Sequence, residues 1–363
     1  MRALLAAAML ACAVSSAAAA PSYDATAWNA FATLTAPTGG GKPVAFETWA
    51  SDSDIYGGTP AWPKPGSRVL ARSLAASAEA FAMHGTSLPA AACQPADPKA
   101  GNFPPGACIG EMVQHNRPVF DAIVNAHLTS TAGLVKAFAG KVPIAFPKDS
   151  IVVKADWVAI PDLLHWLPQQ YKTAAAVRRA YYTNTAILNG RAQEYALLGM
   201  SVQSKDLPDW LWMTFEHRSN PGRCDVIGCH DGFGAAQANV DPRVVPNTDY
   251  GPCAKTPALA ALFKSRRIDP VFANYCLKGT QAAFTTPPSH KPTVLANSVI
   301  ERMNKGVAVA ATSCITCHAY ASFDVHGTPN YAVLPKHPVG APDPKVLAGF
   351  KTHDYLWSIL AAH

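Results

Sequence analysis

The feature that most restricts this chain is a cysteine pair near its end, in the stretch SCITCHAY at residues 313–320. Cys314 and Cys317 are three residues apart, and His318 follows the second cysteine directly. On a helical turn, residues at this spacing share one face, so the two sulfurs can form thioethers with the two vinyl groups of one porphyrin. The adjacent imidazole can then bind the porphyrin iron as its proximal ligand. The spacing therefore predicts one covalent c-type haem.

Two other interpretations of the pair carry less weight. A zinc site would need two more ligands at suitable spacing, and the residues after His318 include no further cysteine. A chance disulfide beside a surface histidine explains the pair but gives no reason for the histidine at the next position. The cysteine–histidine pattern therefore favours haem.

The first residues predict export from the cytoplasm. Arg2 precedes an unbroken apolar run from Ala3 to Val14, and small residues follow, which is the anatomy of a signal peptide. We expect residues 1–19 to be removed and the mature protein to be periplasmic. The apolar run is shorter than the roughly 20 residues of a membrane-spanning helix, and no later stretch is long enough. A lipid anchor at Cys12 is the alternative, which the short run before this cysteine disfavours.

Export to an oxidising compartment makes the remaining cysteines candidates for disulfides. Their spacing favours the pairs Cys93 with Cys108 and Cys253 with Cys276. The two cysteines left over, Cys224 and Cys229, form the longer pattern CxxxxCH with His230. A second haem there is the alternative, but a disulfide is favoured because the pattern is isolated in a glycine-rich loop.

Hydrophobic periodicity indicates an α+β fold. Residues 150–160 alternate apolar and polar side chains, the period of a strand with one buried face, and β-like runs follow at 178–188, 194–204 and 209–219. Strands in succession without long helices between them favour an antiparallel sheet. We therefore expect a β-rich body over residues 20–285. A small helical haem-binding segment over residues 286–363 should pack on that body, because it is short for an independent core. It should include a helix over residues 292–306.

The sixth ligand of the iron remains open, because no methionine follows His318. Met303, on the helix expected before the motif, is one candidate, and the histidines of the tail are others: His326, His337 and His353. Each of these has a plainer interpretation as a core or loop residue. Methionine would raise the reduction potential, histidine would lower it, and an empty position would permit small-molecule chemistry.

A second source of ligands is the stretch WLWMTFEH at residues 210–217. On a strand, Leu211, Met213, Phe215 and His217 would share one face, opposite Trp212, Thr214 and Glu216. His217 or Met213 could then approach the haem as a distal ligand, and His217 and Glu216 are candidates for catalysis. The plainer interpretation of His217 is a core histidine with a hydrogen-bond partner.

The order of several stretches resembles exported bacterial proteins described as cytochrome c family proteins. The resemblance rests on AWNAFATLTAP, FPKDSIVVKADWV, WLWMTFEHRSNPGRC and VLANSVIERM before SCITCH, and it covers most of the mature chain. It implies a single periplasmic haem with Cys314, Cys317 and His318 in the matching positions. It assigns no substrate. The family often has methionine at the place of Ile300, so Met303 inherits no ligand role.

These features predict a periplasmic c-type cytochrome that transfers electrons between partner proteins. A haem-dependent oxidoreductase, with a small molecule bound between body and haem, is the alternative, and the size of the body favours it. A binding protein with haem as a structural staple ranks last. The formal net charge of +6 is scattered along the chain, which argues against nucleic acid as a partner.

Overall fold

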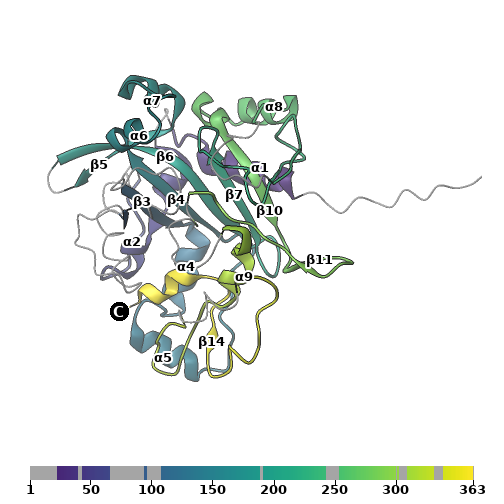
Figure 1. The fold of residues 1–363 in the computed structure, drawn as a ribbon. Coiled ribbons are helices and arrows are strands. Elements are labelled where there is room, and N and C mark those ends of the chain that lie inside the picture. The colour runs from purple at the N-terminus through teal and green to yellow at the C-terminus, as the bar shows by residue number, and fades with distance from the viewer. Residues whose placement is uncertain are drawn as a thin grey trace, which may run out of the picture.

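A computed structural model describes residues 23–39, 43–65, 94–95, 108–188, 191–242, 253–299, 301, 309–330 and 338–362. Its centre is an eight-stranded sheet in the order β1-β3-β4-β6-β7-β10, in which β2 also pairs with β3 and β5 with β6 (Figure 1). All of these pairings are antiparallel. The predicted α+β fold with a β-rich body is confirmed. The strands are β1 (Ala50–Ser51), β2 (Gln94–Pro95), β3 (Cys108–His115), β4 (Ile151–Ala159), β5 (Thr183–Leu188), β6 (Arg191–Ser204), β7 (Leu211–His217) and β10 (Tyr275–Gln281).

The predicted strands at 150–160, 194–204 and 209–219 correspond to β4, β6 and β7. The run at 178–188 is divided, because its first residues end helix α7 (Ala174–Ala180) before β5 begins. Three small two-stranded ribbons lie outside the main sheet. They pair β8 (Cys229–His230) with β9 (Asn239–Val240), β11 (Thr285–Thr286) with β12 (Lys291–Pro292), and β13 (Ser322–Phe323) with β14 (Lys351–Thr352).

One face of the sheet is covered by α1 (Asp24–Thr35) and α8 (Pro257–Ser265). Trp28 and Phe31 of α1 are fully buried, and their rings lie 5.1 and 4.5 Å from the ring of Phe215 on β7. The indole nitrogen of Trp28 donates to the Asp231 carboxylate at 2.9 Å. This face therefore holds a continuous apolar core, to which β4, β6, β7 and β10 all contribute.

The opposite face carries two separate apolar clusters. One cluster joins Trp212 to α4 (Arg117–Asn125), α5 (Thr131–Ala139) and the C-terminal segment. The other joins Val158 and Leu198 to α6 (Ile160–Trp166) and α7. Further short elements complete the described fold: η1 (Ala45–Thr48), α2 (Asp52–Tyr56), η3 (Pro270–Asn274), η5 (Val309–Ala311), α9 (Cys314–Ala319) and η7 (Trp357–Ala361). None of the described helices is long and apolar enough to span a membrane.

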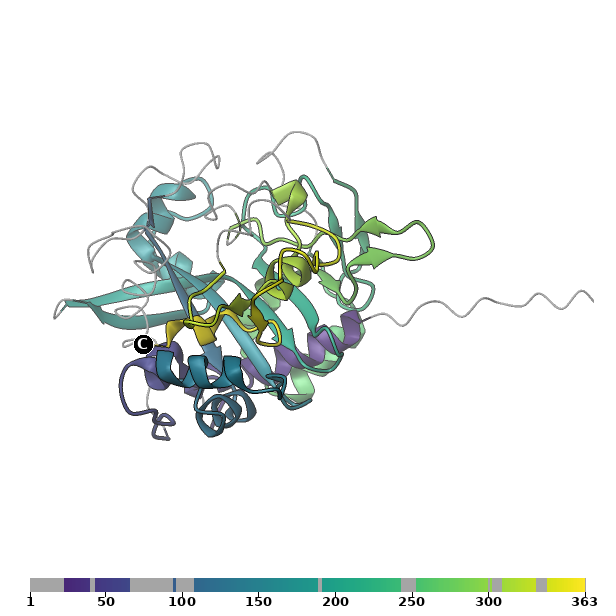
Figure 2. The same cartoon turned by 90° about the horizontal axis from the view of Figure 1, so that it is seen from below.

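The C-terminal segment crosses this second face (Figure 2), but it is less helical than the sequence predicts. Of the expected helix, residues 292–296 are not helical. There the Leu295 amide donates to the Thr312 carbonyl at 3.1 Å, and the Cys314 amide donates to the Leu295 carbonyl at 3.3 Å. Further along, the Glu301 amide donates to the Asn297 carbonyl at 3.3 Å, and Glu301 lies in a 3-10 turn. Besides this turn, the helical elements over the described residues after 286 are α9, η5 and η7.

The α1 core gives a direct test of the fold. Replacing Phe31 with alanine should lower the free energy of unfolding by about 3–5 kcal/mol, because it opens a cavity among buried aromatic rings. Val142→Ala is the control, since Val142 is 79% exposed and its truncation should change stability by less than about 0.5 kcal/mol. Urea unfolding followed by tryptophan fluorescence measures both. Equal stabilities for the two variants would contradict this description of the core.

Candidate haem site

Helix α9 carries the cysteine pair and is docked directly on the sheet. It begins after Ser313, whose hydroxyl accepts a hydrogen bond from the Thr316 amide. Gln281, the last residue of β10, donates to the Ser313 hydroxyl at 2.8 Å and accepts from the Ile315 amide at 3.0 Å. Ile315 is fully buried beneath the helix. The haem motif is thus attached to β10 through the first turn of α9.

Both cysteines of the motif are unpaired in the structure. Burial raises the pKa of Cys314 and raises that of Cys317 to about 11, so both carry protons at neutral pH. Within the described ranges, no group of three or more His, Cys, Asp or Glu side chains could hold a metal ion. A zinc site built on this pair therefore finds no further ligands in that part of the chain. Two free sulfurs on one turn are what thioether attachment requires.

The imidazole of His318 is oriented by a hydrogen bond from Nδ1 to the Tyr355 carbonyl, at 2.8 Å. A carbonyl only accepts, so Nδ1 carries the hydrogen and Nε2 keeps its lone pair. Metal-binding histidines usually make such a bond with the nitrogen that does not face the metal. Burial lowers the pKa of His318 to about 4, which keeps the ring neutral. Nε2 is thereby prepared to bind a metal ion.

Aromatic rings enclose this imidazole. The ring of Trp212 lies 4.5 Å from that of His318, and the ring of Tyr355 lies 6.1 Å from that of Trp212. Trp357 donates from its indole nitrogen to the Cys317 carbonyl at 3.2 Å. Cys317 and His318 themselves remain half-buried. An apolar wall, two free sulfurs and an oriented neutral imidazole fit a covalently bound porphyrin with one edge near the surface.

The face of β7 that meets the haem motif is not the one that carries Met213 and His217, and the interpretation of His217 as a core histidine with a hydrogen-bond partner is confirmed. Met213 belongs to the core beneath α1, so it faces away from α9. His217 accompanies it: its Nε2 lies 3.0 Å from the Ala180 carbonyl, and its ring stacks on Tyr181 at 3.5 Å. Burial lowers the pKa of His217 to about 3. The expectation that Met213 or His217 approaches the haem is therefore wrong, and both are core residues.

The remaining candidates for the sixth ligand are also placed, where the structure describes them. Met303 and His337 lie outside the described residues. His326 is exposed, at a turn where its amide bonds to Asp324. His353 is fully buried, and neither of its ring nitrogens has a partner within the described ranges. Its backbone amide donates to the Ala321 carbonyl at 3.1 Å, and His353 stays a candidate for the sixth ligand.

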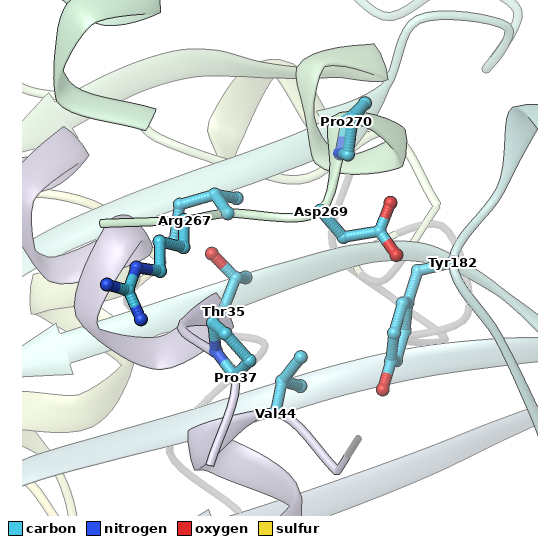
Figure 3. A pocket seen from close by; sticks show the side chains of 8 residues that line it. Thr35, Pro37, Val44, Tyr182, Arg267, Asp269 and Pro270 are labelled. Carbon is cyan, nitrogen blue, oxygen red and sulfur yellow. The ribbon is translucent and has the colours of Figure 1, made fainter. Parts of the chain in front are cut away.

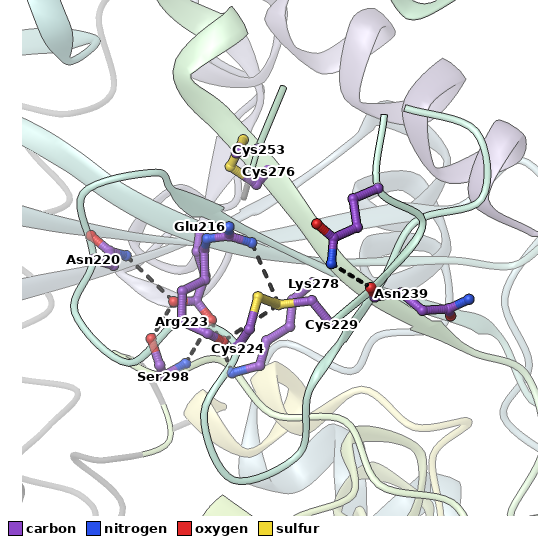
Figure 4. The surroundings of a disulfide bond; sticks show 11 residues. Glu216, Asn220, Arg223, Cys224, Cys229, Asn239, Cys253, Cys276, Lys278 and Ser298 are labelled. Carbon is purple, nitrogen blue, oxygen red and sulfur yellow. Dashed lines mark hydrogen bonds and ion pairs between the residues drawn. A yellow bond between two sulfur atoms is a disulfide. The ribbon is translucent and has the colours of Figure 1, made fainter. Parts of the chain in front are cut away.

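The second motif has a different arrangement. The Sγ atoms of Cys224 and Cys229 are 2.00 Å apart, a bonding distance, and Cys253 is likewise joined to Cys276 (Figure 4). His230 lies with Nδ1 2.6 Å from the Asn239 side chain and Nε2 3.3 Å from Asp24. This geometry is that of a disulfide and a hydrogen-bonded histidine. The proposed partner of Cys108, Cys93, lies outside the described residues.

Sequence reasoning missed a group of charged side chains beside the haem motif. They lie on the second face of the sheet, between its two apolar clusters, and on the segment that covers it. We call them the charged layer; its members are Glu111, Lys154, Asp156, Glu216, Lys278 and Glu301. Lys154 pairs with Glu111 at 3.3 Å and Lys278 with Glu216 at 3.2 Å. The alternation of β4 contained a signal, because Lys154 and Asp156 share its polar face, but that face was expected to meet solvent.

The sheet register aligns three of these carboxyl groups in one row. Asp156 on β4 is paired with Glu111 on β3 and with Gly199 on β6, and Gly199 is paired with Glu216 on β7. Glycine at 199 leaves room for the covering segment: a Cβ there would lie 3.1 Å from the Asn297 side-chain nitrogen and 2.7 Å from the Phe215 carbonyl. The row therefore runs under residues 297–301.

Residues 297–301 are bonded to this row. Glu216 accepts from the Ser298 amide at 2.8 Å and from the Ser298 hydroxyl, and it also faces Asn220 (Figure 4). Asn297 donates from its side chain to the Thr214 hydroxyl at 2.9 Å, and its amide donates to the Glu301 carboxylate. Glu216, a catalytic candidate from the sequence, is thus a buried and fully bonded carboxylate on the haem side of β7.

A hollow elsewhere in the molecule does not compete with this site. It is lined by Thr35, Pro37, Val44, Tyr182 and residues 267–270, and it measures about 260 Å³ (Figure 3). Ligand pockets usually measure about 300–1,000 Å³. Its lining residues lie at the end of α1, at the start of η3 and in the loops beside them, and they include no residue of α9 or of the charged layer. We assign it no ligand.

Comparison with known protein families, curated proteins and solved structures found no match for this chain. The chemistry of the site therefore has to be argued from its own residues. Those residues come from α9, the second face of the sheet, the covering segment and the C-terminal stretch with Tyr355 and Trp357.

Glu301 provides a test of the charged layer. Burial raises the pKa of this carboxyl to about 7, so the folded protein holds a proton there that the unfolded chain, with an ordinary value near 4.5, does not. Stability from this proton is fully present below pH 4.5 and is lost as the pH rises through 7. Between pH 6 and 8 the wild type should lose about 1.3 kcal/mol relative to Glu301→Gln.

Urea unfolding at both pH values measures this difference. The buried histidines also make stability depend on pH, in the opposite direction, but they do so equally in both proteins. The difference between wild type and variant therefore reports Glu301 alone. Glu194→Gln, at an exposed ion pair with Arg178, should follow the wild type. Parallel pH profiles for the wild type and Glu301→Gln would show that Glu301 is already ionised in the folded state.

Proposed function

We propose that this protein is a periplasmic c-type cytochrome that holds one haem through Cys314, Cys317 and His318 and transfers electrons. The observation that carries the proposal is the hydrogen bond from His318 Nδ1 to the Tyr355 carbonyl, which leaves the lone pair on Nε2, the nitrogen that would bind the iron. Bound haem would supply a one-electron exchange between ferric and ferrous iron. The periplasmic location rests on the signal-peptide pattern of residues 1–19.

The protein's own residues would perform three tasks in this function. Cys314 and Cys317 would fix the porphyrin on α9, so that it is retained outside the cell. Tyr355 would hold the His318 ring in one tautomer and one orientation. Trp212 and Trp357 would exclude water from the iron while the half-buried Cys317 leaves an edge open to a redox partner protein.

A haem-dependent oxidoreductase is the second candidate, and the charged layer favours it. Buried carboxyl and ammonium groups beside a redox site can bind and orient a polar substrate or carry its protons. The two functions differ in the coordination of the iron. A closed six-coordinate site that does not bind cyanide or carbon monoxide would support the carrier, and a site that binds either ligand readily would support the enzyme.

Haem attachment is tested with the double variant Cys314→Ala/Cys317→Ala. Expressed in a host that matures c-type cytochromes, the wild type should carry one haem per chain that survives denaturation, and the variant should carry none. The matched control is Cys224→Ser/Cys229→Ser, which removes the other closely spaced cysteine pair and should keep one haem per chain. A pyridine haemochrome assay on purified protein counts the haem and identifies its thioether linkage.

The control also decides between the two motifs. If only Cys224→Ser/Cys229→Ser loses haem, the haem is attached at Cys224 and Cys229 and not at Cys314 and Cys317. Two haems per wild-type chain would mean that both cysteine pairs carry one. A colourless wild-type protein, made in the same host with a known cytochrome as a positive control, would contradict the proposed function itself.

A further inference from the structure

The charged layer contains more acid than base. Its four carboxyl groups face two ammonium groups, and three of the carboxyls, on Asp156, Glu216 and Glu301, are buried. Burying an ionised carboxylate without a partner costs several kcal/mol, so a buried group in excess of its partners holds a proton instead. With both lysines already matched, by Glu111 and Glu216, the excess falls on Asp156 and Glu301.

The arrangement of Asp156 supports this count. It is fully buried, its two carboxyl oxygens have no hydrogen-bond partner within the described ranges, and Glu111 stands directly opposite on β3. Like charges at opposed positions of an antiparallel pair repel each other. Burial, and then the charge of Glu111, raise the pKa of Asp156.

Glu301 faces the same groups from the covering segment. The charges that act on it are those of Lys154 on β4, Lys278 on β10 and Glu216 on β7, and it acts in turn on Asp156. Its charge also raises the pKa of the two motif cysteines of α9, in addition to the effect of burial. Lys154 and Glu111 keep 27% and 22% of their side chains exposed, so protons can reach the layer from water at this edge.

The covering segment joins Glu301 to the haem motif. The Cys314 amide and Sγ both donate to the Leu295 carbonyl, at 3.3 and 3.1 Å. Two residues after Leu295, the backbone amide of Asn297 donates to the Glu301 carboxylate. On the sheet side, Gln281 holds α9 three residues from Lys278. A change of charge at the haem would thus act on Glu301 and Asp156 through packed protein rather than through water, where the interaction would be far weaker.

We propose that Asp156 and Glu301 form a proton-binding site that takes up one proton when the haem on α9 receives an electron, so that this protein transfers an electron together with a proton. The inference rests on the proposed function. A one-electron reductant supplies the electron, water supplies the proton, and one carboxylate of the pair becomes a carboxyl; no bond to the iron forms or breaks. The added negative charge at the haem is what favours the protonated carboxyl.

The pKa of about 7 for Glu301 places this exchange at a useful pH. A carboxyl that is half protonated near neutrality responds to a small change of nearby charge, whereas an ordinary carboxyl would stay ionised in both redox states. Lys154, whose pKa is raised by Glu111, Glu301 and Asp156 against the effect of burial, stays charged throughout. The layer therefore changes by one proton rather than rearranging its ion pairs.

The experiment is a potentiometric titration of the haem-loaded protein between pH 5 and 9. For the wild type, the midpoint potential should fall as the pH rises through neutrality, with a slope that approaches 59 mV per tenfold change in proton concentration. Glu301→Gln should reduce this slope by at least half, and Glu194→Gln should leave it unchanged. Asp156→Asn is the second variant, for the case in which Glu301→Gln does not fold, and it should also reduce the slope.

A second measurement does not depend on any variant. Reduction of the wild type in weakly buffered solution at pH 7 should remove up to about half a proton per haem, because the carboxyl is already half protonated there, and the uptake is followed with an indicator dye. A midpoint potential that is flat from pH 5 to 9, or a slope that survives unchanged in both Glu301→Gln and Asp156→Asn, would overturn the inference. The surviving slope would assign the proton to another group, such as a haem propionate.

The failure of the inference is distinguishable from that of the proposed function. Haem content is measured first on every protein by the pyridine haemochrome assay. A wild type without covalent haem contradicts the proposed function, whereas a haem-loaded wild type with a flat potential contradicts only the proton site.

Discussion

The structure depends on satisfying one buried carboxylate, that of Glu216. An ionised carboxylate in a protein interior is tolerated only with excellent hydrogen bonding, because it has lost its hydration. Here Lys278 supplies the ion pair, and the Ser298 amide and hydroxyl supply two further bonds. Two of these three bonds come from the covering segment, so Glu216 determines how the chain after β10 returns across the sheet.

The conformation of that segment has consequences for the haem motif. Leu295 bonds to Cys314 before the chain turns at Asn297, whose carbonyl accepts from the Glu301 amide, and the Ser298 amide at the start of this turn donates to Glu216. The start of α9 is thereby fixed between the covering segment and Gln281 of β10. The motif is not carried on a separate small domain. It is built into the second face of the large sheet, so the body would form part of the surroundings of the proposed haem.

Much of this could be predicted from the sequence, and the exceptions have physical reasons. Period-2 alternation located β4, β6 and β7, and the cysteine–histidine spacing located the candidate site without any structure. Alternation could not show which face of β7 meets the haem motif, because it shows which residues lie together but not what covers them, and every residue of β7 is buried. The face of β7 that carries Met213 and Phe215 packs against α1, whereas Trp212 on the other face contacts the haem motif.

The charged layer was missed for a related reason. Lys154 and Asp156 on the polar positions of a strand normally indicate solvent, and only the return of residues 295–301 buries them. The helix expected over residues 292–306 does not form over residues 292–296, where Leu295 bonds to Thr312 and Cys314 instead. Long-range polar contacts of this kind leave no periodic signal in a sequence.

If the proposed haem is bound, burying these charges beside it also has an electrostatic consequence of its own. Fully ionised, the layer would carry two more negative than positive charges, and in a medium of low dielectric constant it would stabilise ferric over ferrous iron and lower the reduction potential. Each proton that the layer holds removes part of that effect. The potential of a haem attached here would therefore depend less on its axial ligands alone than on how many protons Asp156 and Glu301 retain, a quantity that β3, β4, β7 and the covering segment set together.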